Sequence, residues 1–192
     1  MQPLKGLTVV TLEHAIAAPF ATRQLADLGA RVIKIERPGV GDFARAYDQR
    51  VRGQASHFVW TNRSKESLTL DLKHPRAAEL LLKLIVEQAD CVVQNLAPGA
   101  AARLGLSFDA LKAQRPDLIV CDISGYGDDP AAPGPYRDKK AYDLLIQSES
   151  GFVSITGTPE EPSKAGLSIA DIAAGVYAYS NILAALLQRQ ID

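Results

Sequence analysis

The sequence predicts an α/β fold with an open, mostly parallel, doubly wound sheet of the Rossmann-like kind and flanking helices. Three observations lead to this prediction. Short apolar runs rich in β-branched residues alternate with helical patterns, and the helical segments are long enough to cross over between parallel strands. The 192 residues are 47% hydrophobic and 22% charged, a composition typical of a globular protein with a sizeable core.

The strand candidates are short apolar runs whose ends carry polar or charged residues. They are 7–13 (LTVVTLE), 30–36 (ARVIKIE), 67–72 (SLTLDL), 90–95 (DCVVQN) and 117–124 (DLIVCDIS). Because strands separated in this way by helices need crossover connections, we expect them to lie parallel in one sheet.

Three segments have the apolar spacing of helices. The segment PFATRQLADLGA begins with Pro19 and ends at Gly29, and HPRAAELLLKLIVEQA (74–89) has a proline in its first turn. The last segment, 169–187, repeats apolar residues at helical spacing and predicts one broad buried face.

The stretch 125–166 differs in composition from the rest of the chain. It is rich in Gly, Pro and charged residues around the short apolar piece YDLLIQSESGFVSI. This predicts surface loops that flank a packed segment, not a linker between domains. We therefore treat 1–192 as one domain. Because the sequence stops directly on a helical pattern, without a Gly or Pro stop signal, we expect it to be part of a longer protein.

The charge balance and the sequence start exclude several classes of protein. With a formal net charge of -1, nothing indicates a nucleic-acid partner. The start MQPLKGLTVVTLE lacks a basic flank before a long apolar run, and no stretch approaches the ~20 apolar residues of a membrane span. We expect a cytoplasmic protein without a membrane partner.

The cysteines and histidines do not form a metal-binding pattern. Cys91 and Cys121 lie inside strand candidates, which favours inert core thiols. His14, His57 and His74 are far apart and lack the spacing of a zinc site, so we expect no metal.

A strand, loop and helix followed by a strand ending in KIERP invites a dinucleotide-binding interpretation, with Glu36 on a ribose. That site needs glycines in the first loop so that the backbone can approach a pyrophosphate. The loop here is EHAIAAP and contains none. We therefore expect Glu36 and Arg37 to face another ligand at the carboxyl ends of the strands.

Several cationic residues fall near this edge of the sheet. Arg37 follows the second strand, Lys73 the third and Arg103 the fourth, and Lys140 lies in the loop region. Open parallel sheets bind ligands at their carboxyl edge. Two interpretations stay open at this point, a solvated rim and a binding site for a phosphate-bearing ligand.

Two acidic residues, Asp143 in KKAYDLLIQ and Asp171 in SIADIAAG, are candidates for chemistry. An Asp at a helix N-terminus is usually only a cap, since the free N–H groups and the dipole stabilise it. The small residues around Asp171 argue for chemistry because they leave room for a bulky partner. They are Gly166, Ala170, Ala173, Ala174 and Gly175.

Six motifs occur in order along nearly the whole chain: LKGLTVVTLEHAIAAPFATRQLADLGARVIKIERPGVGD, NRSKESLTLDLKHP, VVQNLAPGAAARLGL, ISGYG, YDLLIQSESG and SIADIAAG. Together they resemble the amino-terminal half of the class III CoA-transferases and of their α-methylacyl-CoA racemase relatives. Six collinear motifs are far more specific than any one of them alone.

The resemblance implies that this α/β domain binds coenzyme A as a co-substrate, with no tightly bound cofactor. Cationic groups among the implied contacts suit the phosphates of CoA. The implied CoA-binding residues are Ala15, Arg37, Leu70, Lys73, Asn95, Leu96, Arg103 and Lys140.

The family nucleophile is an Asp, and the matching position is Asp171. The resemblance implies that its carboxylate attacks an acyl-CoA to give an aspartyl anhydride, and that an aspartyl-CoA thioester follows. We expect the helix N-terminus to keep Asp171 ionised. Asp143 would orient or polarise groups in the site, or make a structural hydrogen bond.

Racemases of this fold use a His directly before the Asp of the YD position, as one of two bases beside the α-carbon. This sequence has Tyr142 there. With an ordinary pKa of about 10, tyrosine is a poor proton shuttle at neutral pH, so the sequence favours a transferase over a racemase.

The resemblance also bears on the rest of the molecule. Family members are longer, with a second domain that is absent here, a glycine-rich loop over the anhydride, and an interlaced homodimer. A non-catalytic CoA-binding fragment is therefore an alternative.

The segment QRVRGQASHFVWTNRSKESL is similar to members that move CoA from succinyl-CoA to C4 to C5 dicarboxylic acids such as itaconate, mesaconate or citramalate. Arg50 and Arg52 could hold a second carboxylate, although exposed loop arginines usually have no such role.

Overall fold

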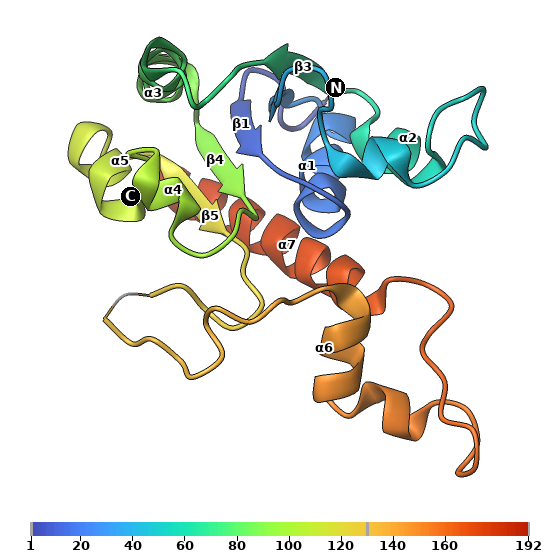
Figure 1. Ribbon diagram of the computed structural model, residues 1–192. Coiled ribbons are helices and arrows are strands. Elements are labelled where there is room, and N and C mark those ends of the chain that lie inside the picture. Colours follow the sequence, from blue (N-terminus) through green and yellow to red (C-terminus); the bar gives the residue numbers. More distant parts are fainter. Residues whose placement is uncertain (1, 130, 192) are drawn as a thin grey trace.

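The computed structural model describes residues 2–129 and 131–191 and has a five-stranded parallel sheet at its centre (Figure 1). The strands are β1 (Thr8–Leu12), β2 (Arg31–Glu36), β3 (Glu66–Thr69), β4 (Cys91–Gln94) and β5 (Ile119–Asp122). They lie in the order β3-β2-β1-β4-β5, so the chain reverses its direction of winding between β1 and β4. The predicted α/β fold with a parallel sheet is confirmed.

Both faces of the sheet are apolar and covered, as expected for parallel strands. Val9 of β1 lies in register with Val32 of β2, and both side chains enter one core with Leu25 of helix α1 (Ala17–Asp27). The next residue in β1, Val10, points to the opposite core. This alternation follows the two-residue repeat of a strand.

Helices α1 and α7 (Ile169–Ile191) cover the first face of the sheet, and α3 (Pro75–Gln88) and α5 (Phe108–Gln114) cover the second (Figure 1). The first core includes Ile182 and Leu186 from α7, while the second includes buried leucines from α3 and α5. Because helices lie on both faces, the predicted doubly wound arrangement is correct.

The predicted helices are present with shifted ends. Helix α1 begins two residues before Pro19, which stands in the first turn, where no helical N–H bond is lost. Helix α3 begins at Pro75, and the imidazole Nδ1 of His74 accepts a hydrogen bond from the N–H of Arg76. Helix α7 continues beyond the predicted residue 187 to Ile191.

Short elements complete the chain, and most had no separate prediction. They are η1 (Phe43–Ala46), α2 (Ser56–Asn62), α4 (Ala100–Arg103), α6 (Asp143–Glu149) and η2 (Phe152–Ile155). Their length explains the omission, since one or two turns give no clear periodicity.

The expectation of a packed apolar piece within 125–166 is corrected. Helix α6 and η2 project away from the sheet in Figure 1 (orange), and Leu144, Leu145 and Ile155 are exposed. Only Gln147 of α6 is buried. Several apolar residues of this segment therefore face solvent, while Ile146, Phe152 and Val153 are half-buried.

Helix α7 also corrects the expectation that no stretch approaches a membrane span. Among the described residues it is the one helix long and apolar enough to cross a membrane, with 23 residues and a mean hydropathy of 1.4. In the structure it packs against α1 and β5, and Ile182 and Leu186 belong to the core of the sheet.

The two cysteines occupy β4 and β5 and form no disulfide. Burial raises the pKa of the Cys121 thiol to about 11 and that of Cys91 further still. Both thiols are therefore protonated at neutral pH, which agrees with the prediction of inert core thiols.

Candidate active site

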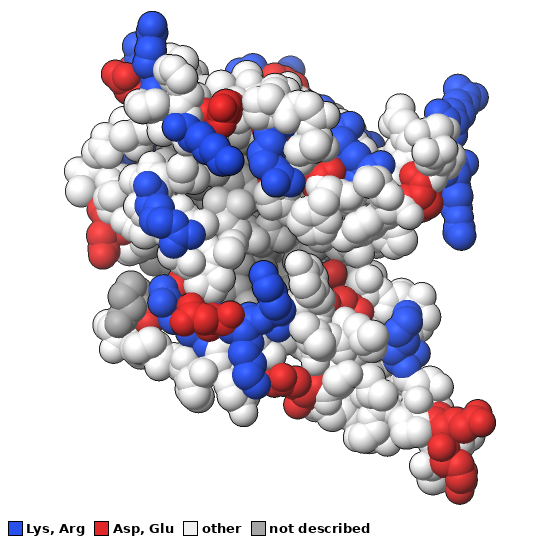
Figure 2. Space-filling model, in the orientation of Figure 1, with Lys and Arg blue, Asp and Glu red and all other residues white. Residues whose placement is uncertain are grey.

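A cavity of about 450 Å³ opens at the carboxyl ends of β1 and β2, beside the point where the winding of the sheet reverses. Figure 2 shows a hollow in the middle of this face, with Lys and Arg side chains along both of its sides. The lining is mainly apolar, with polar groups at the ends of the strands. It comprises Leu12, His14, Ile35, Glu36, Arg37, Pro38, Val40, Leu70, Asp71, Leu72, Lys73, Leu96 and Leu104.

Four of the predicted CoA-binding residues meet at this cavity although they are far apart in the sequence. Arg37 and Lys73 bring exposed cations to its rim, while Leu70 and Leu96 contribute apolar wall. An apolar slot with cations at its rim suits a ligand that has a flat ring and phosphates.

Two further predicted residues, Ala15 and Asn95, shape the loops behind the cavity. The Asn95 side chain makes two hydrogen bonds with the backbone of His14. Its Oδ1 accepts from the His14 N–H at 2.9 Å, and its Nδ2 donates to the His14 carbonyl at 2.9 Å. Ala15 has a left-handed backbone with φ of 62°. A non-glycine residue rarely adopts this conformation, and such strain is frequent at functional sites.

Arg103 and Lys140 lie outside the lining of the cavity. Arg103 ends the short helix α4, and Lys140 lies in the segment that leads to α6, and both are exposed. Their predicted contact with CoA stays a prediction.

Asp143, the first residue of α6, provides the cap of α7. Its Oδ1 accepts hydrogen bonds from the N–H groups of Ala170 at 2.9 Å and Asp171 at 3.4 Å. Its Oδ2 accepts from Gln147, whose own Oε1 accepts from the N–H of Ala165. Asp143 therefore does the work of a helix cap, and the carboxylate of Asp171 is released from that role.

Asp171 lies in the first turn of α7, partly buried and close to a second carboxylate. Burial raises its pKa to about 6, and the charge of Asp143 adds to the effect. The helix N-terminus therefore does not lower this pKa as expected, and the N–H groups of Ala170 and Asp171 are bound by Asp143 instead. The group is nevertheless largely ionised above pH 7.

Tyr47 lies within the electrostatic influence of the Asp171 carboxylate. Burial raises the pKa of Tyr47, and the negative charges of Asp42 and Asp171 raise it further, so its hydroxyl is neutral and close to Asp171. The Tyr47 ring packs against Phe43 at 6.0 Å, and Phe43 stacks on His14 at 5.5 Å between ring centroids. The Tyr47, Phe43 and His14 rings therefore form a row that ends at the cavity, which His14 lines.

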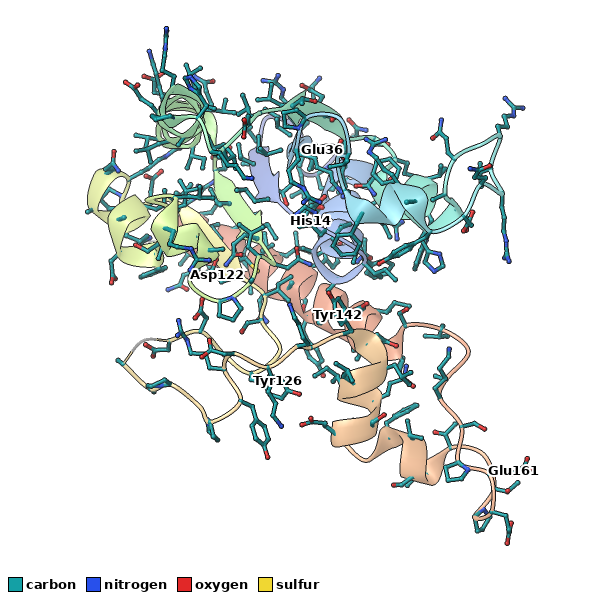
Figure 3. All side chains as sticks on the ribbon, in the orientation of Figure 1. His14, Glu36, Asp122, Tyr126, Tyr142 and Glu161 are labelled. Carbon is teal, nitrogen blue, oxygen red and sulfur yellow. The ribbon has the colours of Figure 1, made fainter. Side chains whose placement is uncertain are left out.

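Tyr142 stands directly before α6 and is exposed, at the junction of α6 and α7 (Figure 3). In the same view His14 lies at the end of β1 and Glu36 at the end of β2. No histidine occupies the Tyr142 position.

The small residues near Asp171 have two separate explanations. A Cβ on Gly175 would lie 2.7 Å from the carbonyl oxygen of Ala17, so this glycine allows α7 to pack closely on α1. A Cβ on Gly166 would meet nothing within 4 Å. Room for a partner is therefore present at Gly166, while Gly175 serves helix packing.

Glu36 corrects the expectation that it faces a ligand, because protein groups occupy both oxygens. Arg45 binds them through its Nε and Nη2 at 2.9 and 2.7 Å, Ser67 donates at 2.5 Å, and the Asp42 N–H donates at 3.0 Å. These bonds lower the pKa of Glu36 to about 2 even though burial opposes ionisation. Arg37 donates to the Gly41 carbonyl at 3.4 Å and is exposed at the rim of the cavity.

A buried cluster of charges that was not predicted from the sequence lies beneath the loop that follows β1. Lys34 donates to Asp42 Oδ2 at 2.6 Å and lies 3.7 Å from Glu13 Oε1, which in turn accepts from Lys65 at 2.6 Å. Burial alone would raise the pKa of Glu13, but the two lysines lower it below its ordinary value. The signal was Lys34 at an inward position of the apolar run ARVIKIE.

Among residues 2–129 and 131–191, no group of three or more His, Cys, Asp or Glu side chains could hold a metal ion. The histidines also have separate surroundings. His14 packs against Phe43, His57 packs against Trp60, and His74 caps α3.

Known proteins of similar sequence share one family. Residues 4–192 match the model of the family described as CoA-transferase family III. The chain belongs to this family. It is 42% identical to the succinate–glutarate CoA-transferase of Agrobacterium fabrum, over 96% of this chain and 47% of that protein.

Other members of CoA-transferase family III are nearly as similar. The identity is 38% to the succinyl-CoA–D-citramalate CoA-transferase of Chloroflexus aurantiacus, over 98% of this chain and 46% of that protein. The crystal structure of a CAIB/BAIF family protein from Brucella suis superposes with a TM-score of 0.89 and 39% identity, over 98% of this chain and 50% of that one. The chain thus spans about half the length of the relatives it matches.

Proposed function

We propose that this chain is the CoA-binding domain of a class III CoA-transferase that moves CoA from an acyl-CoA to a small carboxylic acid. Succinyl-CoA is the proposed donor, and a C4 to C5 dicarboxylic acid is the proposed acceptor, with citramalate, itaconate and mesaconate among the candidates. Relatives named for succinyl-CoA with D-citramalate and for succinate with glutarate support this choice.

One observation carries the assignment of Asp171 as the nucleophile. Asp143 accepts the hydrogen bonds from the first turn of α7. The Asp171 carboxylate is positioned by the same helix, but its oxygens are not used to cap it. Partial burial removes part of its hydration and raises its pKa to about 6, which leaves a basic, ionised carboxylate at neutral pH.

The proposed reaction runs through four acyl transfers. An Asp171 oxygen attacks the thioester carbon and the C–S bond breaks. The products are the CoA thiolate and an aspartyl anhydride. The thiolate attacks the aspartyl carbon and releases succinate, which gives an aspartyl-CoA thioester. The acceptor carboxylate then attacks this thioester to form a second anhydride, and the thiolate takes the new acyl group and regenerates Asp171. This relay conserves the thioester without ATP.

The cavity supports the proposed CoA site. Leu70 and Leu96 offer apolar surface to the adenine and the pantetheine, while Arg37 and Lys73 offer cations to the phosphates. The His14, Phe43 and Tyr47 rings lead from this cavity toward Asp171, as a route for the pantetheine arm requires.

Tyr142 favours a transferase over a racemase. A racemase needs two bases that exchange protons near neutral pH, and a tyrosine has an ordinary pKa of about 10.

The proposal extends to a homodimer in the cytoplasm. Apolar side chains on α6, η2 and α7 are exposed, and they support a dimer because large exposed apolar patches often mark protein interfaces. They are Leu144, Leu145, Ile155 and Tyr177. Two unpaired cysteines agree with a reducing compartment.

The reaction is tested by covalent trapping. The purified protein is incubated with succinyl-CoA and then hydroxylamine, and peptides are analysed by mass spectrometry. We expect a hydroxamate on Asp171 and no change on Asp143. We also expect loss of CoA exchange between succinyl-CoA and the candidate acceptors citramalate, itaconate and mesaconate.

Each alternative has its own outcome in this experiment. Modification of Asp143 in place of Asp171 would reverse the two assignments. Exchange without any modified side chain would exclude the anhydride mechanism, and CoA binding without exchange would favour a non-catalytic domain. Deuterium entry at the α-carbon of a 2-methylacyl-CoA would support a racemase.

A further inference from the structure

The loop between β1 and α1 forms one wall of the cavity in a strained conformation. His14 lines the cavity, and the next residue, Ala15, has a left-handed backbone with φ of 62°. Alanine avoids this region because its Cβ approaches the backbone, so the conformation persists only where surrounding bonds hold it.

Two side chains supply those bonds. Asn95 grips the backbone of His14, and Asp42 Oδ1 accepts a hydrogen bond from the N–H of Ala15 at 3.2 Å. Asp42 is thus the side chain bonded to the strained residue itself.

Asp42 also joins this loop to the one that follows β2. Its Oδ1 accepts from the N–H of Ala44 at 2.9 Å, and its own N–H donates to Glu36 at 3.0 Å. The same loop carries Arg37 and Val40 into the lining of the cavity. One carboxylate therefore connects the two walls.

Burial fixes the position of the Asp42 side chain. It is 0% exposed, and its second oxygen accepts from the buried ammonium of Lys34 at 2.6 Å. Lys34 is held in turn by Asn62 Oδ1 at 2.7 Å and lies beside Glu13. Because Asp42 and Lys34 are both buried, neither side chain can turn toward water. The ion pair therefore keeps the Asp42 carboxylate in position to accept from the N–H of Ala15.

We propose that Asp42 is a positioning residue for the coenzyme cavity, which holds Ala15 in its left-handed conformation and so fixes His14 as a wall for CoA. This inference rests on the proposed function, in that CoA is taken as the occupant. Asp42 itself need not touch the ligand.

Asp42→Asn tests this role with little change in shape. Both Asp42 oxygens accept hydrogen bonds, but asparagine has one acceptor and one donor, so either Ala15 with Ala44 or Lys34 loses its acceptor. We expect the Kd for CoA, measured by equilibrium titration of the purified protein, to rise roughly tenfold.

Thr22→Val is the matched control. Thr22 is equally buried and donates to Glu13 in the same cluster at 2.6 Å, but it makes no bond to the loop at 14–16. We expect it to lower the melting temperature as Asp42→Asn does, while the Kd for CoA stays within about twofold of that of the wild type.

The outcomes separate this inference from the proposed function. If wild type binds CoA and the two variants weaken binding equally, the positioning role is wrong and the CoA site stands. A wild-type protein that binds no CoA would overturn both.

If Asp42→Asn fails to fold, Ala15→Val tests the other end of the same hydrogen bond. A β-branched residue strongly disfavours the left-handed conformation, so the loop should relax while the buried charges stay paired. We expect weaker CoA binding by a folded protein, and unchanged binding would overturn the inference.

Discussion

Asp171 and Asp143 illustrate how two carboxylates on neighbouring helix termini divide their work. Asp143 uses both oxygens in hydrogen bonds, to the start of α7 and to Gln147. Asp171, in the first turn of α7, receives charge repulsion from Asp143 and partial burial. The first arrangement fixes the Asp143 side chain in a structural role, and the second leaves Asp171 with a raised pKa and free oxygens, as a reactive group requires.

Asp171→Ala should abolish CoA exchange and leave the fold intact. The side chain caps nothing, so its removal should change the free energy of unfolding by less than the ~1 kcal/mol that a lost cap costs. Exchange assays and thermal unfolding check this, with Asp138→Ala on the exposed loop as the control. Retained exchange in Asp171→Ala would remove it from the role of nucleophile.

The raised pKa of Asp171 gives activity and stability opposite dependences on pH. Only the ionised carboxylate attacks, so kcat/KM should fall as the pH drops through about 6. The folded state binds the proton more tightly than the unfolded chain, whose carboxyl has the ordinary value of 3.8. The stability gained from this protonation is fully present below pH 3.8 and is lost as the pH rises through 6.

Asp171→Asn isolates this linkage, because it removes the titrating group with little change in shape. The melting temperature of the variant relative to wild type should increase between pH 4 and pH 7. Thermal unfolding across this range measures the difference, and a constant difference would contradict the raised pKa.

At the scale of elements, the contact between α1 and α7 places the nucleophile beside the sheet edge. Gly175 lies in this contact, against the Ala17 carbonyl and the Phe20 ring. Since α7 carries Asp171 one turn earlier, this contact fixes the distance of the carboxylate from the loop that follows β1.

Gly175→Ala should therefore destabilise the protein even though alanine is the better helix former. The added Cβ would lie 2.7 Å from the Ala17 oxygen, and the forced separation should cost about 1–3 kcal/mol of unfolding free energy. Gly166→Ala, where nothing lies within 4 Å, is the control. Equal stabilities in denaturant titrations would show that the contact is not tight.

The cationic ends of the loops after β2 and β3 provide the next prediction. Arg37→Ala and Lys73→Ala should each weaken CoA binding by roughly tenfold, since both groups reach the rim of the cavity. Lys83→Ala, on the exposed side of α3 next to Glu87, should leave the Kd unchanged. Equal Kd values in all three variants would mean that the cations form only a solvated rim.

At the scale of the whole molecule, one side of α7 and the projecting α6 and η2 segment leave apolar surface in solvent. Exposed side chains there include Leu145, Ile155, Tyr177 and Leu187. Relatives that are about twice as long have further chain that could lie against such a surface.

Sedimentation velocity of the protein should give the mass of a dimer at micromolar concentration. Burial of these apolar side chains supplies the driving force, and Tyr177→Glu should shift the equilibrium toward the monomer. Asp138→Ala serves again as the neutral surface change. A monomer across the whole concentration range would contradict the proposed homodimer.

The sequence by itself determined the sheet, its parallel direction and the helices that cover it, because apolar runs of fixed period can bury their faces in few ways. Val9, Val32 and Val93 could be assigned to one core from strand alternation alone. It also indicated Arg37 and Lys73, since the carboxyl ends of parallel strands share one edge, whereas Leu70 and Leu96 were indicated by the family resemblance.

Only the tertiary structure decided which carboxylate caps α7, which glycine serves packing and which charges are buried. Asp143 and Asp171 are both acidic residues at helix starts, and their roles depend on a contact between segments 28 residues apart. The pairing of Asp42 with Lys34 and Ala15 has no local pattern either, because hydrogen bonds between loops depend on where the folded backbone places them.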